Sequence, residues 1–383
     1  MELGYFMMPL HHISRDYHET LEEDREAIEW ADQLGYSEAW VGEHYSSAVE
    51  QITSPLIFLS NLIARTKQIK LATGVICMPQ YHPAVTAGQC AMFDHLTQGR
   101  FIMGVGPGGL VSDFELFGVK DMDRSAMMVE ALDHILTLWR EDPPYKLKGE
   151  FWNIEMPEWT YHDIKTGYVA KPLQQPLHDI KTGYVAKPLQ QPHPPIALSG
   201  MSPFSGTMKL AGSRGYLPVS ANFVGDWVVA THWKAYCEGA AAAGLTPNAD
   251  DWHVARSIFV AETDAEAEAF VKRADGAYDF YFKYLYTLFD RGDVKAGFVV
   301  NKGDDPNALR HEDLRDHFTI YGSPETVAKK ILELRETIGP FGTLLYAAHD
   351  WIEKAPMKES MRLMAEEVMP RVNAALGTAK AAE

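Results

Sequence analysis

Short apolar runs alternate along the chain with longer segments whose apolar residues recur at a helical period. In the segment 20–35, Leu21, Ile28 and Leu34 fall on one helix face and Gly35 supplies the stop. Continuous apolar strands separated by helices are typical of a parallel sheet that is buried on both faces. The expected strands are 3–8, 38–44, 69–78, 100–106, 195–200, 216–221, 253–261 and 342–348.

Strand and helix units that alternate in this way predict an α/β fold, a (β/α)8 TIM barrel, as one domain over residues 1–383. A barrel of this type takes about 250 residues, so roughly 130 must lie outside the repeating units. Two stretches fit no such unit, about 142–194 and 276–320, and are expected to be insertions. The residues from about 351 are expected to form a C-terminal helical tail.

A short phrase is written twice in the first insertion. Residues 162–176 recur unchanged as residues 178–192, with Leu177 between the copies. Repeat architectures need at least three units, and no third copy is present. We therefore expect a duplication within a connection, where extra length costs little closure entropy. The downstream copy leads directly into the fifth strand, so the upstream copy, 162–177, is expected to be the added surface excursion.

Composition and charge narrow the classes of protein. Hydrophobic residues make up 46% of the chain and aromatic residues 11%, which is enough for a large core. A formal net charge of −17 disfavours nucleic acid and anionic membrane surfaces as partners. The three cysteines have no metal-ligand spacing and indicate reduced thiols. The chain shows no signal-peptide pattern and no apolar run of ~20 residues, so a cytoplasmic location is expected.

Polar and small residues gather at the predicted carboxyl ends of the strands, where barrels of this class carry their active sites. The second strand closes on "GEHYSS", in which His44 either caps the strand or belongs to a site. Histidines near strand ends also raise the possibility of a metal-dependent hydrolase. The adjacent pair His11 and His12 lacks the His-x-His spacing of such a site, and no carboxylate–lysine set accompanies it, so no metal is expected.

The stretch "GVGPGG" closes the fourth predicted strand. Gly104, Gly106 and Gly109 have the spacing of a dinucleotide-binding fingerprint, but no clear helix opens directly after them. No Gly-Lys-Ser/Thr follows, so it is not a phosphate-binding P-loop either. By itself the stretch indicates a tight loop in which backbone can approach a flat ligand.

The fifth predicted strand runs into "SGMSPFSG", where Ser202, Pro203 and Ser205 mark the start of a helix. The amino end of a helix at this edge of a barrel is suited to a phosphate group. Plain capping of the helix by a serine hydroxyl is the alternative, and the residues alone leave both open.

The order of these motifs resembles that of the bacterial luciferase-like flavin-dependent monooxygenases. The shared stretches are "EAWVGEHYSS", "TGVICMPQYHPAVTAGQCAMFDHLTQGRFIMGVGPGG", "PHPPIALSGMSP", "YGSPETV" and "EEVMP". They fall in the family's order across nearly the whole chain. Within the family, "GYFMMPLHH", "EAWVGEH" and "GVGPGG" are most similar to limonene monooxygenase-like members.

The resemblance implies a two-component enzyme. Such a protein takes reduced FMN from a separate flavin reductase, adds O2, and oxygenates a small hydrophobic substrate through a flavin hydroperoxide. The chain offers no convincing site for NAD(P)H, in agreement with a separate reductase. Two alternatives stay open, a deazaflavin-dependent hydride-transfer enzyme of the same superfamily and a flavin-binding protein without catalysis.

The resemblance also implies roles for single residues. His44 matches the family's active-site histidine beside the flavin, and Gly74–Val75 matches a non-proline cis peptide under the ring. The remaining cofactor-binding residues are expected to be Gly106, Gly108 and Gly109 in the glycine-rich loop, and Gly200, Met201, Ser202 and Ser205 around the phosphate.

One position departs from the luciferases themselves. They have an arginine on the phosphate where this chain has Pro107, which supplies neither charge nor N–H. Arg124 is the candidate replacement. An ion pair of Arg124 with Asp121 or Asp123 is the alternative.

Apolar residues at the strand ends suit a hydrophobic substrate, although ordinary barrel core would use the same residue types. The expected substrate contacts are Phe6, Met8, His11, Met78, Phe204 and Phe223, whereas Met103 is assigned to the core. Family members commonly pair through helices of the second and third units, so a homodimer is expected through segments 51–66 and 83–98. These segments carry Phe58, Leu62, Cys90 and Phe93.

Overall fold

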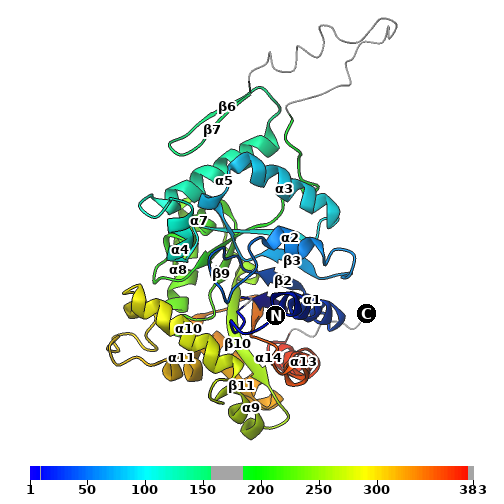
Figure 1. Cartoon of the computed structure of the whole chain (residues 1–383), viewed down its shortest axis with the longest axis vertical. Coiled ribbons are helices and arrows are strands. Elements are labelled where there is room, and N and C mark those ends of the chain that lie inside the picture. Colours follow the sequence, from blue (N-terminus) through cyan, green and yellow to red (C-terminus); the bar gives the residue numbers. More distant parts are fainter. Residues whose placement is uncertain (9, 157–183, 378–383) are drawn as a thin grey trace, which may run out of the picture. The chain divides into compact units, whose positions relative to one another are not determined.

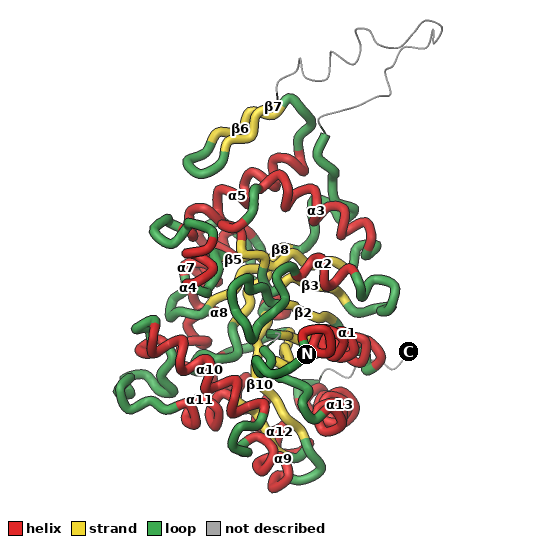
Figure 2. The backbone as a smooth tube through the Cα atoms, in the orientation of Figure 1, coloured by secondary structure: helices red, strands yellow, loops and turns green. Residues whose placement is uncertain are grey.

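In the computed structural model, which describes residues 1–8, 10–156 and 184–377, internal contacts divide the chain into two units. One comprises Met1–Val75, Ile102–Gly104 and Pro195–Glu383, and the other comprises Ile76–Phe101 and Val105–Pro194. Their elements can be followed along the chain in Figure 1 and by type in Figure 2.

Within the described residues, eight parallel strands form a closed ring. Each strand pairs with the next in chain order, and the last one pairs with the first, with Glu2 opposite Thr343. The ring confirms the predicted (β/α)8 TIM barrel and all eight predicted strands. Its strands are β1 (Glu2–Met7), β2 (Glu38–Val41), β3 (Lys70–Thr73), β5 (Phe101–Gly106), β8 (Ile196–Gly200), β9 (Leu217–Ser220), β10 (His253–Val260) and β12 (Thr343–Ala348).

The inside of the ring is filled by side chains from every strand in turn. Strands buried on both faces carry few polar residues, which is why each one reads as a continuous apolar run. Burying such a side chain contributes about 1.5–3 kcal/mol. The interior cluster contains Trp40, Ala72, Ile102, Ala197, Val219, Ala255 and Leu345, with Phe6 and Leu217 partly buried against it.

Two predicted strands end earlier than expected. β2 ends at Val41, so His44 lies in the following loop and does not cap the strand. β3 ends at Thr73, the peptide bond Gly74–Val75 that follows is cis, and the short strand β4 (Ile76–Cys77) comes next. An apolar run predicts burial but carries no signal for such a break.

The helices α1, α2, α9 and α12 of the first unit begin at side-chain caps that the sequence carries, whereas α7 and α8 have none. Asp16 accepts from the Glu19 N–H before α1, and Ser323 accepts from the Thr326 N–H before α12. Most of them follow a ring strand as the fold class requires. They are α1 (Tyr17–Gln33), α2 (Pro55–Ser60), α7 (Gly206–Arg214), α8 (Asp226–Ala242), α9 (Asp264–Val271) and α12 (Pro324–Ile338).

The predicted insertion 276–320 contains α10 (Ala277–Arg291), the 3-10 turn Lys295–Gly297 and α11 (His311–Phe318), and the short strand β11 (Thr319–Gly322) then pairs with β10. Figure 1 shows α10 beside α11. The tail contains α13 (Lys354–Leu363), a π-helical turn (Met364–Val368) and α14 (Met369–Ala375). A cluster we call the α10 cluster joins this insertion to loops of the ring. Its buried members are Leu10, Tyr281, Phe282, Leu285, Phe289, Leu309, Leu314 and Phe318, and Met8, Val49, Phe223 and Tyr284 are among the partly buried ones.

In the second unit, α3 (Pro83–Leu96) packs against α5 (Arg124–Arg140). The indole N–H of Trp139 on α5 donates to the Ala87 carbonyl on α3 at 3.1 Å. The other elements of this unit are β4, the 3-10 turn Met78–Gln80, α4 (Val111–Leu116) and the antiparallel hairpin β6 (Tyr145–Lys148) and β7 (Asn153–Met156).

The described end of the downstream repeat copy, residues 184–192, is anchored within the second unit. Gln190 donates to both carboxylate oxygens of the buried Asp94 at 2.7 Å and to the Phe101 carbonyl at 2.9 Å. Lys187 donates to the Leu138 carbonyl at 2.8 Å. The upstream copy, 162–177, lies outside the described residues, so its expected surface position stays a prediction.

Most of the residues named for a dimer contact point inward. Leu62, Cys90 and Phe93 are buried and Phe58 is half-buried. The large apolar side chains that α3 exposes are Val85, Met92 and Leu96, and α2 exposes Ile57. The period of an amphipathic helix shows that one face is apolar, but only packing decides which apolar residues remain outside.

Candidate active site

His44 lies in the loop after β2, at the carboxyl edge of the ring, and hydrogen bonds hold this loop against the end of β1. Gly42 donates to the Met7 carbonyl at 3.0 Å, and an added Cβ at Gly42 would lie 3.3 Å from the sulfur of Met8. The His44 N–H donates to the Ile52 carbonyl at 3.1 Å. An antiparallel bridge between Leu10 and Glu50 then joins the loops after β1 and β2.

The side chain of His44 faces a buried carboxylate. Its Nε2 lies 3.6 Å from Oε2 of Glu50, whose side chain is 2% exposed. The same oxygen accepts a hydrogen bond from the hydroxyl of Tyr284 on α10 at 3.0 Å. Sequence reasoning missed both partners, because neither lies at a strand end or in a motif.

Gly74, which follows the end of β3 beside this loop, has no side chain. The Gly74 N–H donates to the Val41 carbonyl at 2.7 Å, and a Cβ at Gly74 would lie 3.1 Å from the ring of Phe6. A Cβ at Gly104 would lie 1.9 Å from the Thr73 carbonyl oxygen. Glycine is required there by close backbone approach. The cis bond expected at Gly74–Val75 is present.

The loop after β8 carries Gly200, Met201 and Ser202 to the start of α7. Ser205 occupies the N-cap position, but its side chain does not cap the helix. Its hydroxyl pairs with that of Thr207 at 2.7 Å, and Thr207 donates to the Ser199 carbonyl at 2.7 Å. A Cβ at Gly206 would meet nothing within 4 Å. The first turn of α7 therefore has no serine cap and leaves space beside Gly206, and such a helix start is suited to an anionic group.

A chain of hydrogen bonds from Trp252 through Ser220 and His232 ends on the Ser202 carbonyl in that loop. The indole of Trp252, which can only donate, lies 3.0 Å from Oγ of Ser220. Ser220 therefore donates to Nδ1 of His232 at 2.9 Å, and Nε2 of His232 donates to the Ser202 carbonyl at 3.0 Å. Burial lowers the pKa of His232 to about 4, so the ring is neutral and acts as a fixed link.

The helix α10 supplies polar contacts as well as an apolar wall. Asn222, directly after β9, donates to Tyr281 Oη at 3.0 Å and to Ser257 Oγ at 3.1 Å. Burial raises the pKa of Tyr281, with a smaller contribution from the charge of Glu50. His349, directly after β12, packs its ring against Tyr281 at 4.4 Å, and burial lowers its pKa to about 3. Its ring is therefore neutral at ordinary pH.

The predicted substrate contact His11 is engaged elsewhere. Its Nδ1 lies 2.8 Å from Asp350 and its Nε2 lies 3.1 Å from Asp24. Burial alone would lower the pKa of His11, but the two carboxylates outweigh it and raise the pKa to about 10. Arg15 also donates to Asp350 at 2.8 Å. Both ring nitrogens are used in this buried ion-pair network, so the geometry argues against a substrate contact.

The other predicted substrate contacts of the first unit differ in exposure. Phe6 and Met8 are partly buried, at the ring interior and in the α10 cluster respectively. Phe223 lies in the α10 cluster, 5.9 Å from both Phe289 and Phe298. Phe204 is 60% exposed with a positive φ of 51°, and its N–H donates to Thr231 at 2.8 Å.

In the second unit, the glycine-rich loop and Arg124 meet the same aromatic ring. A Cβ at Gly108, where φ is 85°, would lie 2.9 Å from the Phe114 ring, and the Arg124 guanidinium lies 3.9 Å over that ring. Arg124 also donates to the Lys120 carbonyl at 2.7 Å. No ion pair joins it to Asp121 or Asp123, both of which are described, so the surface ion pair is not what holds Arg124. Gly106 ends β5, a Cβ at Gly109 would meet nothing within 4 Å, and Met78 is fully buried.

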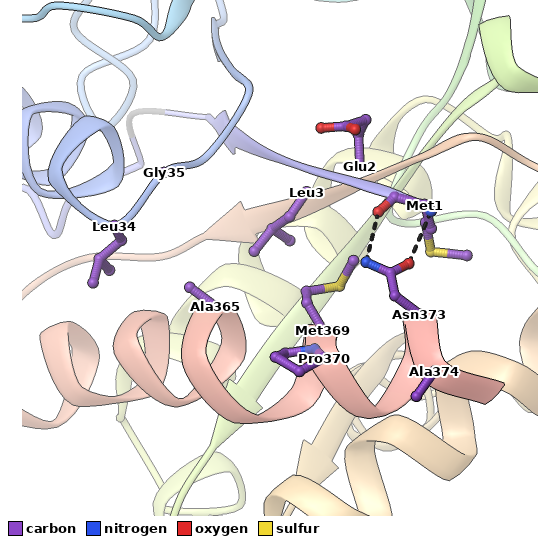
Figure 3. A pocket seen from close by; sticks show the side chains of 10 residues that line it. All are labelled: Met1, Glu2, Leu3, Leu34, Gly35, Ala365, Met369, Pro370, Asn373 and Ala374. Atoms are coloured by element: carbon purple, nitrogen blue, oxygen red, sulfur yellow. Dashed lines mark hydrogen bonds between the residues drawn. The ribbon is translucent and has the colours of Figure 1, made fainter. Parts of the chain in front are cut away.

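A separate pocket lies at the opposite end of β1. Its walls come from the amino end of that strand, the end of α1, the π-helical turn and α14, and Asn373 bonds the terminal amine of Met1 at 2.9 Å (Figure 3). Barrels of this class place their chemistry at the carboxyl ends of the strands, so this pocket is not the candidate site. It is lined by Met1, Glu2, Leu3, Leu34, Gly35, Ala365, Met369, Pro370, Asn373 and Ala374.

Across residues 1–8, 10–156 and 184–377, no three His, Cys, Asp or Glu side chains gather in a geometry that could hold a metal ion. No helix in those ranges is both long enough and apolar enough to cross a bilayer.

Comparison with known proteins gives consistent matches. The family model described as luciferase-like monooxygenase matches residues 1–339. The chain is 32% identical to 4-hydroxyprotoasukamycin monooxygenase of Streptomyces nodosus subsp. asukaensis, over 98% of this chain and 93% of that protein. It is 31% identical to limonene 1,2-monooxygenase of Rhodococcus erythropolis, over 98% and 88% of the two chains.

Solved structures agree with these matches. The oxygenating constituent of 3,6-diketocamphane monooxygenase from Pseudomonas putida, a type II Baeyer-Villiger monooxygenase in complex with FMN, superposes with a TM-score of 0.84. It is 30% identical, and the match covers 97% of this chain and 98% of that one. An F420-dependent secondary alcohol dehydrogenase reaches a TM-score of 0.68 at 19% identity over 97% and 98% of the two chains, which shows a shared fold alone.

Proposed function

Because the chain belongs to the luciferase-like monooxygenase family, we propose that it is the oxygenase component of a two-component FMN-dependent monooxygenase. A separate flavin reductase supplies reduced FMN, and O2 and a small hydrophobic substrate complete the reaction. The observation that carries the proposal is the pairing of His44 with the buried Glu50 beside the bare backbone of Gly74–Val75, at the carboxyl edge of the ring. The Gly74–Val75 peptide, expected to lie under a flat ring, occurs together with an ionisable pair.

The residues of the first unit fit FMN in two respects. The backbone at Gly74–Val75 presents no Cβ from Gly74 to a ring lying over it, and the first turn of α7 has no serine cap from Ser205. Gly200, Met201, Ser202 and Ser205 are proposed to surround the phosphate. Arg124 and the loop at Gly106, Gly108 and Gly109 remain sequence-based predictions for the same cofactor.

Reduced FMN, when bound, supplies the reaction of O2 that transfers one oxygen atom to the substrate. The chain contributes the surroundings of that reaction. His44 holds a proton at Nε2 beside Glu50 and can give it up or retain it at the reacting centre. The apolar side chains Phe6, Met8 and Phe223 exclude water and leave room for a hydrophobic substrate.

The test uses purified protein with a flavin reductase, FMN, NADH and 18O2. A panel of limonene, 2,5- and 3,6-diketocamphane and simple aromatics separates the addition of oxygen to an alkene, a ketone or a C–H bond. The expected result is a product carrying one 18O atom. Parallel reactions with reduced deazaflavin coenzyme test the hydride-transfer alternative, and turnover with that coenzyme alone would overturn the proposal. FMN binding without any product would favour a non-catalytic role.

The assembly and the location are proposed separately. A homodimer is supported by the exposed apolar side chains Val85, Met92 and Leu96, which follow one face of α3. Light scattering that returned the chain mass of 42.9 kDa would contradict it. The cytoplasm is the proposed location, where the three cysteine thiols of the chain would stay reduced.

A further inference from the structure

The carboxylate of Glu50 is buried and has few partners. Its Oε2 lies 3.6 Å from Nε2 of His44 and accepts from Tyr284 at 3.0 Å. Its Oε1 has no hydrogen-bond partner among the described residues. Buried polar atoms usually have hydrogen-bond partners, so a carboxylate that has one oxygen unpaired and the other turned toward a histidine points to a role in that pair.

We infer that Glu50 is a positioning residue that keeps a proton on His44, and that Tyr284 of α10 fixes the carboxylate in the position needed to do so. The inference rests on the proposed function, because it assigns His44 its partner in that reaction. It assigns Glu50 and Tyr284 a role in setting the protonation of His44.

The electrostatic reason is direct. A carboxylate within about 4–6 Å favours the protonated form of an imidazole, and a buried pair is screened by salt much less than an exposed one. Because Glu50 faces Nε2, the proton that it stabilises is the one on that nitrogen. Tyr284 donates to the same carboxylate oxygen, which restricts the orientation of the Glu50 side chain toward His44.

The loop that contains Ser47 and Glu50 holds the His44–Glu50 pair in position. Ser47 Oγ lies 3.2 Å from the Tyr284 hydroxyl and accepts from the Glu50 N–H at 3.2 Å. The bridge between Leu10 and Glu50 fixes the backbone on the other side. The α10 cluster packs Tyr284 with Leu10 and Val49, so the geometry of the pair depends on α10 being seated against these loops.

Other titratable groups lie near the pair. Tyr281, one turn before Tyr284 on α10, senses the charge of Glu50. Glu43 and Tyr45 are the chain neighbours of His44. A test must therefore separate the effect of Glu50 from effects of these groups, which a substitution that removes only the charge of Glu50 achieves.

The measurement is the titration of the His44 imidazole by 15N NMR in the protein without flavin, with the signal assigned by its loss in His44→Ala. Glu50→Gln removes the charge and nearly preserves shape. We expect the titration midpoint of His44 to fall by about one pH unit or more. Glu50→Asp, which keeps the charge one methylene further away, should give an intermediate value.

A matched control exists on β2. Glu38 is 3% exposed and its carboxylate lies 2.8 Å from Nε2 of His253, so it is also a buried glutamate paired with a histidine. Glu38→Gln should leave the titration of His44 unchanged. Tyr284→Phe should lower the midpoint of His44 by less than Glu50→Gln does, and Tyr286→Phe on the same helix should not move it.

A folded Glu50→Gln protein whose His44 titrates as in the wild type would overturn the inference. With reductase, FMN and substrate, Glu50→Gln should also release more hydrogen peroxide per NADH, with a shifted pH profile. If the titration moves but the wild type oxygenates none of the substrates, the pairing stands and the proposed function fails. If the wild type oxygenates substrate and neither the titration nor the pH profile moves, the inference alone fails.

Discussion

His232 Nε2 and the carbonyl oxygen of Ser202 lie 3.0 Å apart, although 30 residues separate them in the chain. This bond connects α8 to the loop that opens α7. Since burial lowers the pKa of His232 to about 4, the ring stays neutral at ordinary pH, and its single N–H, at Nε2, donates to the Ser202 carbonyl. The loop proposed to surround the phosphate is therefore held by a side chain that carries no charge at ordinary pH.

Ser220→Ala should weaken FMN more than riboflavin. The change leaves Nδ1 of His232 and the Trp252 indole without their shared partner, which costs about 1–3 kcal/mol and loosens the loop at Ser202. Fluorescence titration with both flavins measures the difference. Ser213→Ala, which removes a hydroxyl that bonds the Leu210 carbonyl on α7, is the control. Equal losses for FMN and riboflavin would disconnect the chain of bonds from the phosphate.

His44→Ala should bind reduced FMN but release hydrogen peroxide instead of oxygenated product. The proton that His44 holds beside Glu50 is lost, while the bare backbone at Gly74 is unchanged. The ratio of product to NADH consumed measures this coupling. His12→Ala, in the neighbouring loop, removes an exposed histidine and should keep it. Unchanged coupling in His44→Ala would remove His44 from the mechanism.

Arg124→Ala should also weaken FMN more than riboflavin if this guanidinium neutralises the phosphate. Loss of one charge-assisted contact costs about 1.5–3 kcal/mol. Arg124→Lys keeps the charge but not the planar group that stacks on Phe114, so it should recover only part of the affinity. Lys120→Ala, close by in the chain, is the control. A riboflavin loss as large as the FMN loss would show that Arg124 acts through packing.

The His11 network should make stability depend on pH in a defined direction. The folded-state pKa of His11, about 10, is above its unfolded value of 6.5. Its contribution is therefore complete below pH 6.5 and is lost as pH rises through about 10. His11→Ala leaves Asp24 and Asp350 without their common partner and should cost about 3–5 kcal/mol at pH 6.

Urea denaturation at pH 6 and pH 10 checks this prediction, with His18→Ala on α1 as an exposed control. The difference between wild type and His11→Ala should shrink toward pH 10. A difference that stays constant across this range would show that His11 stabilises by packing instead of by charge.

Deleting residues 162–177 should leave the melting temperature and FMN binding nearly unchanged. The deletion keeps the downstream copy, whose Gln190 bonds the buried Asp94. Gln190→Ala should lower the melting temperature, because the buried carboxylate loses its side-chain donor, Nε2 of Gln190, at a cost of about 1–3 kcal/mol, while the backbone N–H still donates to it. Gln174→Ala, the same residue of the upstream copy, is the matched control. A deletion protein that fails to fold would make the duplication structural.

The sequence by itself determined the eight-stranded ring and several features of the loops at its carboxyl edge. Strands buried on both faces carry few polar residues, so each of the eight appears as a mostly apolar run between helical segments. The motif order was also enough to place the cis bond at Gly74–Val75. These features are local, or they recur with a period, and the chain records them directly.

Only the tertiary structure decided which side chains meet. Tyr284 reaches Glu50 across 234 residues, and His11 reaches Asp350 across 339. No periodicity or spacing encodes such pairs, because they depend on how an insertion and two distant loops pack over the ring. The same reason explains why His11 was expected to face substrate and why Glu50 was not expected at all. Burial and charge pairing are properties of the packed chain, and a residue's partners across the fold set them.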